Sequence, residues 1–146
     1  MVCKNCGYRD DDPDRSWELR IQKQLLSLNE VGTNAKGNAG RKYRGQRKHY
    51  IRKFGPWASH LPLPTGHRQV IVTRQYRSVR SARKYPARSY DWDNLVGGSK
   101  PLVDALRKSG LLLDDNPKNV TVAYRQEPSG TKSDYVLIEI QEFDRT

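Results

Sequence analysis

The distribution of charge along this chain constrains its fold more than any other feature. Residues 31–90 contain no acidic residue, yet they hold 15 of the 27 lysines and arginines. The rest of the chain has 12 basic and 16 acidic residues, so the net charge of +11 comes from one basic block. Because no acid in the block can pair with its cations, the block favours a polyanionic partner, whose condensed counterions lysine and arginine displace.

The size and composition indicate one small domain with a modest core. The chain has 146 residues, of which 35% are hydrophobic, and its mean hydropathy is −0.91. A length of this order suits one domain, and pairing with a second copy would help to bury its apolar surface. The sequence contains no apolar run of about 18 residues and no basic-then-apolar leader, so we expect a soluble intracellular protein.

Hydrophobic periodicity predicts a domain over residues 16–146, preceded by a tail over residues 1–15. Alternation of period two predicts strands, and apolar residues at three- and four-residue steps predict helices. We expect strands at 16–23 and 67–76, a loop at 32–40, helices at 41–54 and 101–108, and a β-hairpin formed by 119–127 and 135–143. These elements indicate an α/β (α+β) fold, with a mixed sheet of about four strands packed against two or three helices.

Two parts of the basic block are candidate nucleic-acid surfaces. The helix expected at 41–54 carries cations around a semi-apolar face, and the segment 77–90 alternates cations with tyrosines. Arginine contacts phosphate and exposed bases stack on aromatic rings, although the tyrosines can equally anchor the segment to the core. The candidate nucleic-acid-binding residues are Arg41, Lys42, Arg44, Arg47, Lys48, Arg74, Arg77, Arg80, Arg83, Lys84, Arg88 and Asn94.

The tail contains the only cysteines, Cys3 and Cys6, in the run Cys-Lys-Asn-Cys-Gly. This spacing is that of one knuckle of a zinc site, which needs two further ligands. Either a second chain or a partner completes a Zn²⁺ site, or the tail is disordered and carries two free thiols.

Two pairs of aspartates flank the helix expected at 101–108. Asp91 and Asp93 end the basic block, and Asp114 and Asp115 precede the next strand. Residues i and i+2 of an extended segment point to the same side, so Asp91 and Asp93 can converge on one ion. A helix of about eight residues that folds back would bring the second pair beside Asp91.

Carboxylates that lie this close repel one another unless a divalent cation such as Mg²⁺ binds between them. The alternative is structural: Asp93 or Asn94 caps the helix, and residues 115–117 form a turn.

Three short motifs lie within residues 91–115. They are Asp-Trp-Asp-Asn-Leu from residue 91, Lys-Pro-Leu-Val-Asp-Ala-Leu from residue 100 and Gly-Leu-Leu-Leu-Asp-Asp from residue 110. In type and order they resemble the motifs of the RusA family of Holliday-junction resolvases. Over the remainder of residues 16–143 only the order of elements resembles that family.

The resemblance implies a small homodimeric endonuclease, common in phages, with a fold built on a mixed sheet. It implies that Asp91, Asp93 and Asp115 are the metal-binding catalytic aspartates, that Asp114 adjoins them and that Lys100 is the essential lysine. The expected activity is resolution of Holliday junctions or related branched DNA by paired phosphodiester hydrolysis, with Mg²⁺ or Mn²⁺. The expected partners are branched DNA and a second copy, with no membrane and no small-molecule substrate, in the cytoplasm of a bacterial or phage-infected cell.

The sequence departs from the family pattern between Asp91 and Lys100. Residues 96–99, Val-Gly-Gly-Ser, lengthen this segment, and the two glycines would let the extra residues bulge out. Trp92 also stands where the family usually has an aliphatic residue. Two other functions fit the same sequence: a non-catalytic basic DNA- or RNA-binding protein, and a nuclease of the same fold that acts on flaps or forks.

Overall fold

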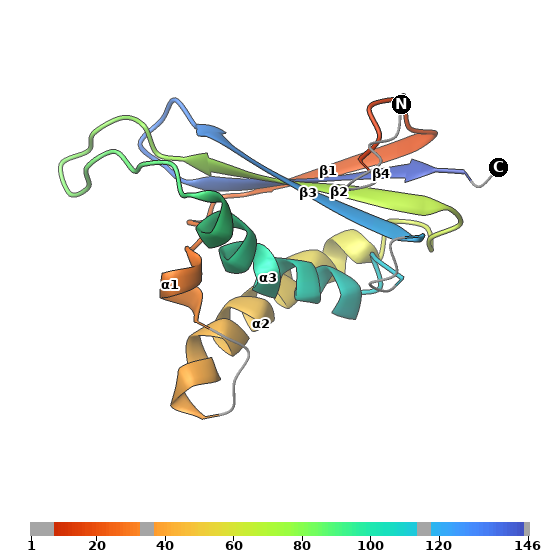
Figure 1. Ribbon diagram of the computed structural model, residues 1–146, viewed down its shortest axis with the longest axis horizontal. Helices are drawn as coiled ribbons and strands as arrows, with labels where there is room; N and C mark the ends of the chain where they lie inside the picture. The colour runs from red at the N-terminus through yellow and green to blue at the C-terminus, as the bar shows by residue number, and fades with distance from the viewer. Residues whose placement is uncertain (1–7, 33–36, 114–117, 145–146) are drawn as a thin grey trace.

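The computed structural model describes residues 8–32, 37–113 and 118–144. Its elements are β1 (Arg15–Ile21), α1 (Leu28–Val31), α2 (Asn38–Ala58), β2 (His67–Tyr76), α3 (Trp92–Lys108), β3 (Val120–Pro128) and β4 (Tyr135–Phe143). The four strands form one mixed sheet, and the helices lie on one of its faces (Figure 1). The fold class that the periodicity predicts is therefore confirmed.

The order of strands in the sheet differs from the one that the sequence predicts. The strands lie in the order β1-β4-β2-β3, with β4 antiparallel to β1 and β2, and with β3 parallel to β2. The prediction that β3 and β4 form a hairpin is wrong, because β4 inserts between β1 and β2 and β3 occupies the edge. α3 supplies the long crossover that the parallel pair β2 and β3 requires.

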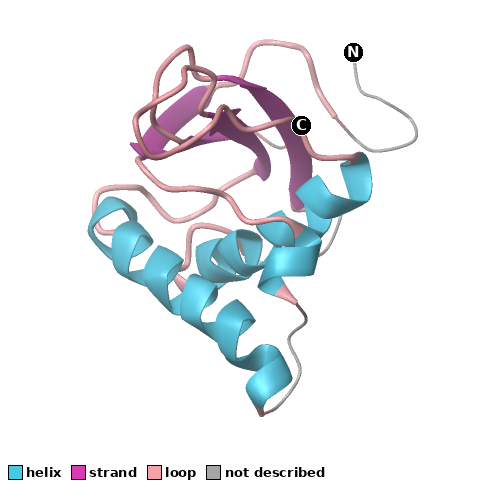
Figure 2. Cartoon of the chain, turned by 90° about the vertical axis from the view of Figure 1, so that its left-hand side faces the viewer, coloured by secondary structure: helices cyan, strands magenta, loops and turns pink. Residues whose placement is uncertain are grey.

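The core lies between the sheet and the helical layer. Val70 and Val72 of β2 alternate with residues that face away, and they pack with Val136, Ile138 and Ile140 of β4. On the other side of the core are Tyr50, Phe54, Leu102 and Leu106, from α2 and α3. Figure 2 shows the same two layers from the side. Among the described residues, no helix is long and apolar enough to cross a membrane.

Helix α2 extends beyond both ends of the helix predicted at 41–54. It begins at Asn38, inside the segment that the glycines and asparagines predict as a loop, and it continues to Ala58. Its inner face carries three buried aromatic residues, Tyr43, Tyr50 and Phe54, at steps of seven and four residues. Burial of this stripe explains why the helix forms despite its many cations, since tertiary packing rather than propensity stabilises most helices in proteins.

Helix α3 is twice as long as the helix predicted at 101–108. It spans 17 residues, begins at Trp92 and includes Gly97, Gly98 and Pro101. The prediction that the glycines bulge out is wrong, because a neighbouring segment passes very close to them. A Cβ atom on Gly98 would lie 1.9 Å from the carbonyl oxygen of Leu26, and one on Gly97 would lie 2.7 Å from Leu28. The glycines therefore allow the turn around α1 to pack directly on α3.

The sheet face opposite the helices is partly covered by the chain that precedes β1. The backbone of Arg9 exchanges two hydrogen bonds with the side chain of Gln69, at 2.7 and 2.9 Å. The Arg9 guanidinium lies 4.1 Å from the ring centroid of Phe143, and Tyr8 accepts a hydrogen bond from Arg125. This part of the predicted tail is thus bound to the domain, whereas Cys3 and Cys6 lie outside the described residues.

Candidate carboxylate site and basic surfaces

Asp91 and Asp93 lie at the amino-terminal end of α3, and both side chains are exposed. Asp91 is the N-cap: its Oδ1 accepts a hydrogen bond from the backbone N–H of Asn94 at 3.0 Å. The capping alternative to the metal site is therefore correct in kind, although the capping residue is Asp91 rather than Asp93 or Asn94. Their strand-like spacing predicts that the two aspartates share an extended segment. This prediction is wrong, because α3 starts at Trp92.

The two aspartates nevertheless suit a hard cation. Asp93 sits in the first helical turn and makes no hydrogen bond or ion pair with the described part of the chain. Asp91 uses one oxygen for its cap and keeps the other, and an ionised carboxylate can accept from about four directions. Exposed carboxylates are the oxygen donors that Mg²⁺ takes while it retains several waters.

Lys100 lies on the same helical stripe as Asp93. Seven residues separate them, which in an α-helix is close to two turns and about 10 Å along the axis. Long side chains in helices lean toward the amino terminus, so the exposed Lys100 side chain extends along the helix toward Asp93. The lengthened segment 96–99 therefore keeps Lys100 on the face of α3 that carries Asp93.

Asp114 and Asp115 lie outside the described residues. The prediction of a short helix of about eight residues between the two aspartate pairs is wrong. α3 has 17 residues and is about 25 Å long. Lys118, just beyond the aspartates, has its carbonyl oxygen 3.1 Å from Nδ1 of His67, at the start of β2. Tyr90, just before Asp91, bonds to Gln126 near the end of β3. Within the described ranges, no three His, Cys, Asp or Glu side chains lie close enough together to hold a metal ion.

Two of the arginines assigned to nucleic acid hold the loop of residues 77–90 in place instead. Arg74 is buried; it donates to the carbonyl of Arg88 at 2.8 Å, and its guanidinium lies 3.4 Å from the ring centroid of Tyr90. Burial lowers the pKa of Arg74. Arg77 forms an ion pair with Asp134 at 2.9 Å and donates to the carbonyl of Tyr85. The sequence assignment of Arg74 to a DNA surface is therefore wrong, and Arg77 is mainly structural.

The remaining cations of this loop face outward. They are Arg80, Arg83, Lys84 and Arg88, all exposed. The tyrosines of the segment divide between the two roles that the sequence leaves open. Tyr90 is an anchor, because its hydroxyl donates to the carbonyl of Leu25 at 2.8 Å. Tyr85 is 71% exposed, with the guanidinium of Arg80 4.8 Å from its ring centroid, and it is available for stacking.

The second basic surface is the outer side of α2. Arg41, Lys42 and Lys48 are exposed, whereas Arg44 and Arg47 are half-buried and Arg44 donates to the carbonyl of Gly37. Tyr43, on the inner side, donates a hydrogen bond to Asp104 of α3, and burial together with this bond raises the pKa of Tyr43. Asp104 also pairs with Arg107, at 3.0 Å. The aspartate of the Asp-Ala-Leu motif thus joins α3 to α2.

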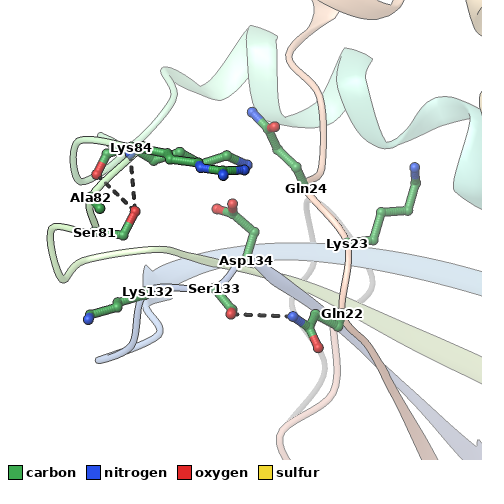
Figure 3. Close-up of a pocket in the computed structure, with 10 residues that line it drawn as sticks. Gln22, Lys23, Gln24, Ser81, Ala82, Lys84, Lys132, Ser133 and Asp134 are labelled. Atoms are coloured by element: carbon green, nitrogen blue, oxygen red, sulfur yellow. Dashed lines mark hydrogen bonds between the residues drawn. The ribbon is translucent and has the colours of Figure 1, made fainter.

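Sequence reasoning missed a group of residues that meets only in the folded chain. An open hollow of about 530 Å³ lies between the end of β1, the loop after β2 and the turn before β4 (Figure 3). We call it the strand-end hollow; it is lined by Gln22, Lys23, Gln24, Ser81, Ala82, Arg83, Lys84, Lys132, Ser133 and Asp134. Only Arg83 and Lys84 belong to the sequence-derived set, because no local pattern links these three segments.

Comparison with known proteins does not assign the chain to a family. No protein-family model and no curated protein sequence matches it.

Proposed function

We propose that this chain is a metal-dependent endonuclease that binds and cuts branched DNA, with a four-way junction as its main substrate. The observation that supports this most is the position of Asp91 and Asp93. The loop of residues 77–90 leads directly into the start of α3, so the two exposed carboxylates adjoin one basic surface; the amino-terminal half of α2, a second basic surface, lies beyond α1 in the same helical layer (Figure 1). A phosphodiester drawn to the basic surfaces is thereby held near carboxylates.

Asp91 and Asp93 are the described residues that would hold Mg²⁺ or Mn²⁺. Such an ion supplies Lewis acidity and a water of lowered pKa for phosphodiester hydrolysis. Asp114 and Asp115, which the resemblance to the RusA family adds to this set, remain predictions.

The cations have two roles in the proposed reaction: charge neutralisation at the scissile phosphate and binding of the DNA arms. Lys100, on the stripe of Asp93, neutralises charge on the scissile phosphate or on the leaving oxygen. The exposed cations of α2 and of the 77–90 loop bind the DNA arms through phosphate. A four-way junction has two-fold symmetry, so a C₂ homodimer presents one such site to each of two opposing strands.

The direct test is cleavage of labelled four-way junction, flap, fork and linear duplex, with and without Mg²⁺. We expect paired nicks in the four-way junction only with the metal. Asp93→Asn should lower the cleavage rate by at least about 10²-fold, since a charged metal ligand is lost, and should leave junction affinity equal or higher. Asp91→Asn should do the same without loss of stability, because asparagine caps a helix as well as aspartate does.

Asp12→Asn is the matched control, because Asp12 is exposed and lies in the chain before β1, outside the proposed site. It should cut like the wild type. Retained cleavage in Asp93→Asn would contradict the proposed site. Salt-sensitive binding without any metal-dependent nicking would instead identify the alternative, a non-catalytic nucleic-acid-binding protein, and faster cutting of flaps or forks would identify the third function.

A further inference from the structure

The strand-end hollow combines two kinds of chemistry. Three of its cations, Arg83, Lys84 and Lys132, come from the loop and turn that border it, and we call them the cationic rim. Lys23 is directed away from the hollow: its ammonium lies 5.4 Å from the ring centroid of Tyr50 on α2, where burial lowers its pKa. Asp134 is the one acid among the lining residues.

Asp134 is fixed in position by Arg77. Its Oδ1 accepts from the Arg77 backbone N–H at 3.0 Å, and its Oδ2 accepts from the Arg77 guanidinium at 2.9 Å. Figure 3 shows the Asp134 carboxylate directed into the space between the Ser81–Lys84 turn and Gln24. Each oxygen keeps a further lone pair, so Asp134 can accept a hydrogen bond from a ligand but cannot donate one while ionised.

Amide and hydroxyl groups complete the lining. Gln22 donates to Ser133 Oγ at 3.3 Å, and Ser81 and Lys84 close a turn through hydrogen bonds of 3.0 and 3.1 Å. Gln24 lines the upper side of the hollow (Figure 3); its amide hydrogen-bonds Tyr90 and has further donor and acceptor capacity. An acceptor-only carboxylate beside an amide suits the edge of a nucleobase, and the cationic rim suits a phosphate.

The hollow lies close to the carboxylate site. Tyr90 directly precedes Asp91, and its hydroxyl donates to the carbonyl of Leu25 at 2.8 Å, one residue after Gln24. One tyrosine side chain therefore bridges the hollow and the start of α3. The volume of about 530 Å³ lies within the range of small-ligand sites, about 300–1,000 Å³.

We propose that the strand-end hollow binds one unpaired nucleotide of a DNA strand. The phosphate of this nucleotide contacts the cationic rim, and the base edge faces Asp134 and Gln24. Because Asp134 only accepts, the hollow favours a base with an exocyclic amino group over thymine, whose single N3–H lies between two carbonyl oxygens that repel a carboxylate. The inference rests on the proposed function, because it takes the ligand to be DNA. It adds a site that recognises an unpaired base near Asp91 and Asp93.

The test compares a duplex that carries one extrahelical cytosine with the same duplex fully paired. Affinities are measured by fluorescence anisotropy in EDTA, so the outcome does not depend on cleavage. We expect the bulged duplex to bind about tenfold more tightly, and an extrahelical thymine to lose most of that preference. Arg83→Ala with Lys132→Ala should reduce the preference to near unity, and Gln24→Leu should reduce the difference between cytosine and thymine.

The matched control is Arg52→Ala with Lys108→Ala, which removes the same charges from exposed positions outside the hollow. Any effect on affinity should be the same for both duplexes, so their ratio should stay unchanged. Equal affinity of the wild type for both duplexes would overturn the proposal, as would a preference that survives in Arg83→Ala with Lys132→Ala. Competition by free deoxycytidine monophosphate near the Kd of the bulged duplex would also overturn it, because the hollow would then be a mononucleotide site. Failure of nicking alone, with the preference intact, would refute the proposed function and not this site.

Discussion

At the scale of single residues, the strongest electrostatic feature is a buried ion pair in the sheet. Arg68 and Glu142 are almost fully buried, and Arg68 Nε donates to Glu142 Oε1 at 3.0 Å. Arg68 also donates to the carbonyls of Leu111 and Pro62, at 2.8 and 2.6 Å, and so ties β2 to the chain at the end of α3. Arg15 also pairs with Glu142. Arg68 belongs to the acid-free block, so one arginine of this block pairs with an acid far along the chain.

This pair makes stability depend on pH. Burial disfavours the charged form of Glu142, yet hydrogen bonds from Arg68 and Thr65 outweigh burial and hold the pKa of Glu142 below the ordinary 4.5. A lowered folded-state pKa stabilises the fold above the unfolded pKa, and this contribution is lost as pH falls through the folded pKa. We therefore expect the free energy of unfolding, measured with urea, to fall as the pH decreases below about 4.5.

Glu142→Gln isolates this contribution. It leaves the buried Arg68 charge without its acid and should lower the free energy of unfolding at pH 7 by about 3–5 kcal/mol. It should also flatten the decrease at acid pH. Glu18→Gln, at an exposed position of β1, is the control and should change neither quantity. An unchanged acid profile in Glu142→Gln would show that other carboxylates cause it.

At the scale of elements, the glycine pair in α3 decides how the helical layer packs. Gly98→Ala would place a methyl group against the backbone of Leu26, which cannot move aside as a flexible side chain can. We expect this variant to lose about 3 kcal/mol or more of unfolding free energy, measured by urea denaturation. Gly45→Ala is the matched variant, because nothing lies within 4 Å of a Cβ at that exposed position of α2. It should gain about 1 kcal/mol from helix propensity. Equal effects in the two variants would contradict the close approach of α3 to the turn around α1.

These glycines also show where sequence reasoning reaches its limit. Period-two alternation predicts β2 and β4 at their observed positions, because one face of each strand is buried in the core. The first turns of α3 were missed because two adjacent glycines weaken helix propensity locally, while tertiary packing requires them. The hairpin was wrong for a related reason: periodicity identifies strands but not their neighbours, and the placement of β4 beside β1 depends on contacts far apart in the sequence.

Some features of the candidate site also follow from the sequence, whereas others depend on the fold. That one of residues 91–94 caps a helix follows from local pattern. The burial of Arg74 and the assembly of the strand-end hollow do not, because each depends on where the 77–90 loop packs in the folded chain. A basic residue in an acid-free segment is therefore weak evidence for a DNA contact until its burial is known.

At the scale of the whole molecule, the two basic surfaces lie on different elements: one leads into the start of α3, and the other lies beyond α1 (Figure 1). α2 belongs to the helical layer, and the 77–90 loop extends from the end of β2 beyond the sheet (Figure 1). A linear duplex and a branched DNA would use such surfaces differently. A single arm can engage one surface, whereas two arms that diverge from a branch can engage both.

This arrangement predicts the salt dependence of junction binding. The slope of log Kd against log[salt] measures the number of neutralised phosphates, and each lost phosphate contact should reduce it by about 0.9. We expect Lys42→Ala with Lys48→Ala on α2, and Lys84→Ala with Arg88→Ala on the loop, each to reduce the slope for a four-way junction. When the two pairs are combined, the two reductions in slope should add, because residues on separate elements that share no partner act independently.

The same variants distinguish a branch-binding protein from a general duplex binder. A linear duplex engages one surface at a time. On this DNA, the reduction in salt slope from combining the pairs should be smaller than the sum of the separate reductions. Lys108→Ala, at the far end of α3 from Asp91, is the control and should leave both slopes unchanged. If the combined variant shows the same additive loss on linear duplex as on the junction, the two surfaces act as one continuous duplex-binding face, and branch selectivity must then come from the strand-end hollow or from a second copy of the chain.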